Sequence, residues 1–182
     1  MKESEDLEFI DRCLKGEHGA FERLVAKYQN PIYNVALRMV HDTADAEDVA
    51  QTAFVKAFEK LGSFDRKYKF FSWLYRIAVN EALSFLSHRN RFDRLQEETA
   101  GEEDNQQTRS EEEERDSTIQ KALKELKADH RSIVVLRHFE GLSYEEIGEI
   151  LNISPKKVKS RLFAARMVLR QILVRKGVSE ND

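Results

Sequence analysis

Residues 141–161 read GLSYEEIGEILNISPKKVKSR and predict two short helices separated by a three-residue turn, residues 152–154. Ser154 is a good N-cap for the second helix because its hydroxyl can accept a hydrogen bond from an orphan backbone N–H. Pro155 suits the first helical position, where its missing N–H costs no hydrogen bond. A helix, a tight turn and a second, capped helix are typical of motifs that place one helix in the major groove of DNA.

The second helix of this motif is predicted to be basic on its exposed side. From Asn152 to Val178 the chain has no Asp or Glu but eight Lys or Arg. Spacings of four, three, four and three residues predict one buried stripe, made of Val158, Leu162, Ala165, Leu169 and Ile172. The side facing away from this stripe carries Lys156, Ser160, Phe163 and Met167, flanked by Lys159, Arg166 and Arg170. A merely solubilising face is the alternative, but the absence of acids favours contact with the phosphates of duplex DNA.

The composition of the 182-residue chain favours helices throughout, with two Pro, seven Gly and abundant Leu, Ala, Glu and Lys. The single cysteine, Cys13, excludes an internal disulfide and suits a reducing compartment. No apolar run approaches the ~20 residues that a membrane span needs. The acidic start, residues 1–6, lacks the apolar core of a secretory signal. We therefore predict an all-α, soluble, cytoplasmic protein that does not insert into a membrane.

Charge divides the chain into three segments. Residues 1–95 carry no net charge, residues 96–116 carry −8 and residues 117–182 carry +5. The middle segment contains one Ala and no larger apolar residue, so it cannot offset its ordering entropy by burial and is predicted to be a flexible, solvated linker. The Glu run near its end also favours a helix start. A sharper interpretation is that its acids shield the basic helix in the free protein.

Apolar residues at helical spacing predict that the first segment is helical. A first helix ends at Gly16, and Pro31 is expected to interrupt or kink the next one. A helix with an acidic start at Asp45 ends at Gly62, and Ser72 caps the last helix of the segment. The aromatic residues expected in the core include Phe54, Phe58 and Trp73.

The loop before this last helix interleaves cations with aromatic rings. Between Ser63 and Phe71 it contains Arg66, Lys67 and Lys69 together with Phe64, Tyr68 and Phe70. This combination suits an unpaired base, which can stack on a ring while its phosphates meet Lys or Arg. The loop is therefore a candidate site for single-stranded nucleic acid.

Two separate stretches of the chain resemble one family. Residues 45–58 (DAEDVAQTAFVKAF) followed by residues 71–80 (FSWLYRIAVN) resemble the promoter-melting domain of bacterial extracytoplasmic-function (ECF) sigma factors. Residues 141–148 (GLSYEEIG), with Lys159, Ser160 and Arg161 further on, resemble the helix-turn-helix domain of the same family. The resemblance covers about residues 6–94 and 117–176, in the order and spacing of the family.

The resemblance implies two small helical domains and a dissociable initiation subunit of bacterial RNA polymerase. The first domain, residues 1–95, would dock on the coiled coil of the polymerase β′ subunit and recognise and open the −10 element. The second, residues 117–182, would read the −35 duplex and contact the β flap. Members of the family are commonly held inactive by an anti-sigma factor, which is a further implied partner. No cofactor and no metal are implied.

The resemblance also implies three sets of contact residues, to which the charge patterns above contribute. Contacts to the −35 element fall on Lys156, Lys157, Lys159, Ser160, Arg161, Phe163 and Arg166. Contacts to the −10 element fall on Arg66, Lys67, Tyr68, Arg76, Asn80 and Ser84. Contacts to core polymerase fall on Asp45, Glu47, Asp48, Gln51 and Lys56 of the helix with the acidic start, although these acids also suit a solvated helix N-terminus.

Two other classes of function remain as alternatives. An ordinary helix-turn-helix regulator would bind duplex DNA alone, but it has no reason to carry residues 45–80. A hydrolase is the remoter class, because the sequence shows no catalytic constellation and no Gly-rich phosphate loop. The five histidines are scattered without a metal-ligand spacing, and Cys13 stands alone. We therefore predict a binding protein and not an enzyme.

Overall fold

The computed structural model describes residues 3–17, 19–95 and 111–178, and every regular element in these ranges is a helix. The predicted all-α fold is thus confirmed. In chain order the elements are α1 (Glu3–Leu14), α2 (Gly19–Val40), α3 (Thr43–Glu59), η1 (Leu61–Ser63), α4 (Phe70–Leu95), α5 (Glu111–Glu125), α6 (Ala128–Val134), η2 (Val135–Phe139), α7 (Tyr144–Leu151) and α8 (Pro155–Arg175). Within these ranges no helix is both long enough and apolar enough to cross a bilayer.

The segment predicted to be a linker, residues 96–116, falls largely outside this description. Residues 96–110, and with them half of the acids proposed to shield the basic helix, are not among the described residues. Residues 111–116 are described and belong to α5, which begins at Glu111. A helix start here has a physical reason, since acidic side chains are favoured near the positive end of the helix dipole.

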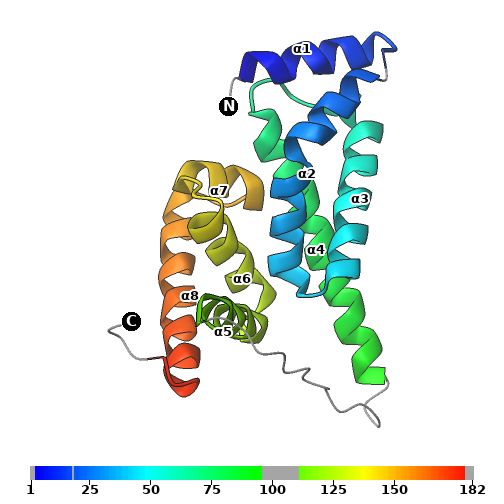
Figure 1. Cartoon of the computed structure of the whole chain (residues 1–182). Coiled ribbons are helices and arrows are strands. Elements are labelled where there is room, and N and C mark those ends of the chain that lie inside the picture. The colour runs from blue at the N-terminus through cyan, green and yellow to red at the C-terminus, as the bar shows by residue number, and fades with distance from the viewer. Residues whose placement is uncertain (1–2, 18, 96–110, 179–182) are drawn as a thin grey trace.

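The first domain is a bundle of α2, α3 and α4, with α1 lying across one end of it (Figure 1). A buried carboxylate attaches α1 to the bundle: Asp6 accepts a hydrogen bond of 2.6 Å from the Tyr28 hydroxyl and an ion pair from Lys27. Because a buried carboxylate is costly unless it is paired, these two partners fix where α1 sits. The position of α1 matters because it borders the cation-rich loop that precedes α4.

Two local predictions about the first domain are wrong, and a third holds at most in one of its two forms. The sequence predicts that Pro31 interrupts or kinks its helix, and α2 runs through it without interruption. The buried side chains on both sides of Pro31 outweigh a cost of about 3 kcal/mol for an internal proline. Ser72 is not a cap, because α4 begins at Phe70 and places Ser72 inside the first turn. Phe58 is 41% exposed, with its ring centroid 5.1 Å from that of Phe21, whereas Phe54 and Trp73 pack half-buried against the core.

The second domain is built from α5 to α8. Its second helix is α6, which is followed directly by one π-helical turn, η2. The buried guanidinium of Arg131 caps the end of α5, donating to the carbonyl oxygens of Lys124 at 2.7 Å, Leu123 at 2.9 Å and Leu126 at 3.1 Å. These are the carbonyls that lack helical partners at a C-terminus, so Arg131 replaces the missing backbone donors.

The two domains pack side by side, with α7 against α4 (Figure 1). Arg131 also donates to the carbonyl oxygen of Met39, which lies at the C-terminal end of α2 in the first domain. The guanidinium of Arg38, one residue earlier, lies 4.4 Å from the ring centroid of Phe139 in the second domain. The end of α2 is therefore a main point of attachment between the domains.

His41 follows directly on this end of α2, with a backbone φ of +61°. Its Nε2 atom is buried and has no hydrogen-bond partner among the described residues. Burial, together with the positive charges of Arg131 and Lys124, lowers the pKa of His41 to about 4. The imidazole is therefore neutral in this arrangement at physiological pH.

The structure predicts a pH dependence that is specific to His41. Because its pKa is lower in the folded chain than in the unfolded chain, its contribution to stability is complete above about pH 6.5 and is lost as the pH falls towards 4. Between pH 7.5 and pH 5.5 the wild type should lose about 1 kcal/mol more unfolding free energy than His41→Asn. Asn tolerates the positive φ and does not titrate. Urea unfolding of both chains at both pH values measures the difference, and equal losses would contradict this assignment.

Candidate nucleic-acid interface

The helix-turn-helix predicted for residues 141–161 is present, and both of its helices have a capped N-terminus. Ser143 and Glu146 form a capping box: the Ser143 hydroxyl accepts from the Glu146 N–H at 3.1 Å, and the Glu146 carboxylate accepts from the Ser143 N–H at 2.9 Å. Ser154 caps α8 as predicted, accepting from the Lys157 N–H at 3.3 Å, with Pro155 at the first helical position. The local sequence therefore determines where both helices begin.

The turn between α7 and α8 requires a close approach of two backbone segments. A Cβ atom on Gly148 would lie 2.7 Å from the carbonyl oxygen of Ile153, which is closer than real side chains approach. Asn152 makes the chain reversal in the left-handed region, with φ of 54°. Glycine at residue 148 and asparagine at residue 152 thus set the angle at which α8 leaves α7.

Helix α8 presents the predicted −35 residues along one side. The stripe on its other side is buried as predicted at Val158, Leu162, Ala165 and Ile172, and Leu169 packs half-buried against the core. Phe163 is 68% exposed, the largest exposed fraction among the large apolar side chains described. Arg161 is half-buried, and the other predicted residues are exposed: Lys156, Lys157, Lys159, Ser160, Phe163 and Arg166. Arg166 also donates to the His138 ring at 3.1 Å, which connects α8 to η2.

The cation-rich loop between η1 and α4 forms a second site, on the first domain. Arg66, Lys67 and Tyr68 are all exposed, and Tyr68 is 48% exposed. Beside them lies a hollow of about 210 Å³, lined by Asp6, Leu7, Arg66, Lys67, Tyr68, Lys69 and Phe70. Arg66 pairs with Asp11 of α1 and holds the pKa of that carboxyl below its usual value, chiefly through their hydrogen bond.

A cluster of three aromatic rings supports this loop at its two ends. The rings of Phe64, Phe70 and Trp73 form a triangle with centroids 5.4 to 5.7 Å apart. Phe64 lies at the start of the loop and Phe70 at the start of α4, so the cluster holds both ends of the loop together. The exposed cations and Tyr68 therefore extend from a fixed base.

The predicted −10 residues on α4 do not all face solvent. Arg76, Asn80 and Ser84 are spaced by four residues and share one side of the helix. Asn80 and Ser84 are exposed. Arg76 is half-buried, and its Nε donates to the backbone carbonyl oxygen of Glu149 in α7 at 3.0 Å. In this arrangement Arg76, one of the six predicted −10 residues, is therefore already bound to the second domain.

The predicted polymerase-binding residues on α3 separate into two groups. Glu47, Asp48 and Gln51 are exposed. The other two make contacts with α4: Asp45 pairs with Arg89 at 3.2 Å, and Lys56 pairs with Glu81. The accessible part of this face is therefore more acidic than the full predicted set.

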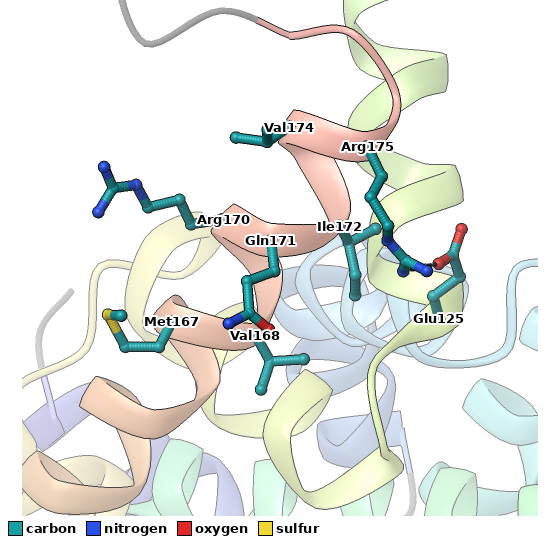
Figure 2. A pocket seen from close by; sticks show the side chains of 8 residues that line it. All are labelled: Glu125, Met167, Val168, Arg170, Gln171, Ile172, Val174 and Arg175. Carbon is teal, nitrogen blue, oxygen red and sulfur yellow. Dashed lines mark hydrogen bonds and ion pairs between the residues drawn. The ribbon is translucent and has the colours of Figure 1, made fainter.

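Sequence reasoning missed a groove beside the end of α8. It has a volume of about 770 Å³, and Figure 2 shows its lining residues, Glu125, Met167, Val168, Arg170, Gln171, Ile172, Val174 and Arg175. Arg175 pairs with Glu125 at 2.9 Å and closes the groove on the side of α5. A signal was present in the sequence, since Val168 and Val174 are apolar residues that lie off the predicted buried stripe.

Comparisons with known proteins match both domains. The family model described as Sigma-70 region 2 matches residues 24–92, and the one described as Sigma-70, region 4 matches residues 117–169. Among solved structures, CnrH in complex with the cytosolic domain of CnrY has a TM-score of 0.71 at 26% identity, over 94% of this chain and 98% of that one. RpoE in complex with the anti-sigma factor NepR from Bartonella quintana has a TM-score of 0.67 at 26% identity, over 84% and 96%.

Full-length relatives agree with the domain matches. The RNA polymerase sigma-H factor of Pseudomonas aeruginosa is 36% identical over 185 residues, covering 95% of this chain and 96% of the relative. The ECF RNA polymerase sigma factor SigW of Bacillus subtilis is 35% identical over 176 residues, covering 90% and 94%. With both domains matched in order and nearly the whole chain aligned, this protein belongs to the ECF subfamily of bacterial RNA polymerase sigma factors.

Proposed function

We propose that this ECF sigma factor directs core RNA polymerase to promoters by reading a −35 duplex with α8 and capturing a −10 base with the first domain. The observation that carries the proposal is the pairing of two different exposed surfaces on one chain. One is a capped basic helix suited to a major groove, and the other is a cation-rich aromatic loop suited to a single strand.

The exposed side of α8 has the chemistry for direct readout of a duplex. Lys159 and Ser160 lie in its second turn, where a recognition helix contacts base edges. A lysine typically reads the acceptors of guanine, and the edge of an aromatic ring such as Phe163 can contact a thymine methyl. Lys156, Lys157 and Arg166 then contact the phosphates on both sides of these bases. Such contacts add affinity but carry no sequence information.

The first domain has the chemistry to stabilise an opened strand. Flipping a base out of the duplex costs roughly a few kcal/mol, so an opened state needs a site that holds the extruded base. The hollow beside Tyr68 is open to solvent and has cations at its rim. Asn80 and Ser84 supply hydrogen-bonding groups along the exposed side of α4. We assign −10 capture to this loop and helix together.

We assign the binding of core polymerase to two further surfaces. The exposed acids Glu47 and Asp48, with Gln51, suit a basic helical partner, which is the role assigned to the β′ coiled coil. The groove of Figure 2 is lined by four apolar side chains together with Arg170 and Arg175, a mixture that suits an amphipathic segment of the β flap. An anti-sigma factor is a further partner, by analogy with the solved RpoE–NepR complex.

Reconstituted transcription tests the function directly. Purified core enzyme and this chain are incubated with a library of genomic fragments, and transcript starts are mapped by sequencing. We expect starts at a small set of sites that share −35 and −10 sequences. If no specific start appears while the chain binds duplex DNA alone, it acts as an ordinary helix-turn-helix regulator and the proposal is wrong.

The double substitution Lys159→Ala and Ser160→Ala should impair −35 recognition selectively. Loss of a base-contacting lysine and its neighbour is expected to weaken binding to a −35 duplex by about 1–3 kcal/mol. Because both side chains are exposed, folding and affinity for core polymerase should be unchanged. Fluorescence anisotropy with duplex and with core measures the two affinities. An equal loss of core affinity would count against the role assigned to these residues.

Asp48→Arg should weaken binding to core polymerase, because it places a cation where the basic partner is expected. Reversing one charge at the rim of an interface typically alters association rate and salt dependence. Glu22→Arg is the matched control, since Glu22 is an exposed acid near the start of α2. Titration of labelled protein with core at two salt concentrations compares the variants. Unchanged affinity for Asp48→Arg would refute the docking surface.

A further inference from the structure

One of the cations assigned to the −35 duplex is held by a side chain from another helical element. Arg166 lies on the exposed side of α8, and its Nε donates to Nε2 of His138 at 3.1 Å. His138 belongs to η2, the π-helical turn that follows α6. Lys159, Phe163 and Arg166 are spaced by four and three residues, so Arg166 lies on the side of α8 that is proposed to face the duplex.

The direction of this hydrogen bond determines the protonation of His138. A guanidinium can only donate, so Nε2 must carry no proton, and the neutral imidazole then carries its proton on Nδ1. Partial burial, together with the positive charges of Arg166 on α8 and Arg137 on η2, lowers the pKa of His138 and favours the same neutral form. At physiological pH the partner of Arg166 is therefore uncharged.

An uncharged partner distinguishes Arg166 from other arginines on the surface. Four of them are held by carboxylates, in the pairs Arg12–Glu17, Arg66–Asp11, Arg89–Asp45 and Arg175–Glu125. No acid in the described ranges pairs with Arg166. The carboxylate of Glu140, two residues beyond His138, accepts instead from the Tyr75 hydroxyl at 2.8 Å. A carboxylate offsets the charge of the cation that it holds, whereas a neutral ring leaves the charge of Arg166 intact.

The turn that carries His138 is itself held by its neighbours. Arg137 donates to the carbonyl oxygen of Leu142 at 2.6 Å, and its guanidinium lies 5.2 Å from the ring centroid of Tyr144. On the other side of His138, the Phe139 ring packs on the guanidinium of Arg38. A side chain can orient another group only when its own support is fixed, and these contacts provide that support.

We propose that His138 is a positioning residue for DNA binding, which orients Arg166 towards a backbone phosphate without reducing its charge. The proposal rests on the role assigned to α8 above and adds how one of its cations is oriented. Nε is the guanidinium donor nearest the stem, so its bond to His138 leaves Nη1 and Nη2 for the oxygens of a phosphate. Holding a long side chain in advance also reduces the rotamer entropy that is lost when DNA binds.

The protonation of His138 can be tested in the free full-length chain without DNA. Long-range ¹H–¹⁵N correlation spectra distinguish the two imidazole tautomers, and at neutral pH we expect the His138 proton on Nδ1. Arg166→Ala should raise the pKa of His138 in an NMR titration, because it removes a positive charge beside the ring. A proton on Nε2 in the wild type, or an unchanged pKa in Arg166→Ala, would overturn the proposal.

Duplex binding tests whether this contact matters for DNA. The probe is a labelled duplex of mixed sequence, about 25 base pairs long, because phosphate contacts are independent of sequence. His138→Leu removes the acceptor, and we expect about threefold weaker binding with an unchanged slope of log affinity against log salt. His138→Gln keeps a neutral acceptor and should bind as wild type does. His88→Leu is the matched control, since His88 contacts Arg91 at 3.4 Å on α4 of the first domain, and it should also bind as wild type does.

A purely structural contact would give a different pattern. His138 and Arg166 are both exposed, so His138→Leu should leave the free energy of unfolding in urea unchanged while duplex binding weakens. His138→Glu should still hold Arg166 but offset its charge, so the salt slope should become shallower by about 0.9, the value for one phosphate contact, without loss of stability. Wild-type duplex affinity in His138→Leu, an unchanged salt slope in His138→Glu, or a loss of affinity matched by a loss of stability would overturn the positioning role.

The outcomes separate this proposal from the function on which it rests. Promoter-specific transcription together with full duplex affinity of His138→Leu would refute the positioning role and leave the function standing. Conversely, a chain with the His138 proton on Nδ1 and weaker duplex binding in His138→Leu that starts no specific transcript would refute the promoter function and support the positioning role.

Discussion

The arrangement of the two domains depends on one buried guanidinium. Arg131 donates to the carbonyls at the end of α5 through Nε and Nη2, and to the Met39 carbonyl at the end of α2 through Nη1. Burial lowers the pKa of Arg131 to about 10, so it still carries its charge at neutral pH, where the negative ends of two helix dipoles offset its desolvation. By joining these two ends it brings α7 against α4, and the contacts of Arg76 and Tyr75 follow from that placement.

The interior of each domain and the boundary between them differ in chemistry. The domain interiors are built from fully buried apolar side chains such as Leu24 and Leu74 in the first domain and Ile133 and Leu162 in the second. The boundary carries charged and hydrogen-bonding groups, including Glu140, whose pKa burial raises. An apolar core is lost only by unfolding, whereas water can replace polar contacts one by one. A polar boundary therefore suits two domains that remain folded when they part, as the proposed reading of two promoter elements requires.

Local features of the site were predictable because neighbouring residues determine them. The Ser154 cap, the turn at residues 152–154 and the buried stripe of α8 follow from hydrogen bonding and helical period alone. The errors arose where tertiary packing overrode a local rule. Pro31 is accommodated inside α2 because the helix is buried on both sides of it, and Ser72 is displaced from the cap position because Phe70, packed against Tyr28, starts α4 two residues earlier.

The sequence by itself determined the helices, their caps, the exposed basic side of α8 and the two-domain order of the family, since periodicity, charge and motif spacing are properties of neighbouring residues. Only the tertiary structure decided which of the candidate residues are accessible. The partner of Arg76 is a backbone carbonyl more than seventy residues away. Every residue carries such a carbonyl, so no side-chain pattern could have identified Glu149 as the acceptor. The pairing exists because Arg131 and the ends of two helices fix how the domains meet.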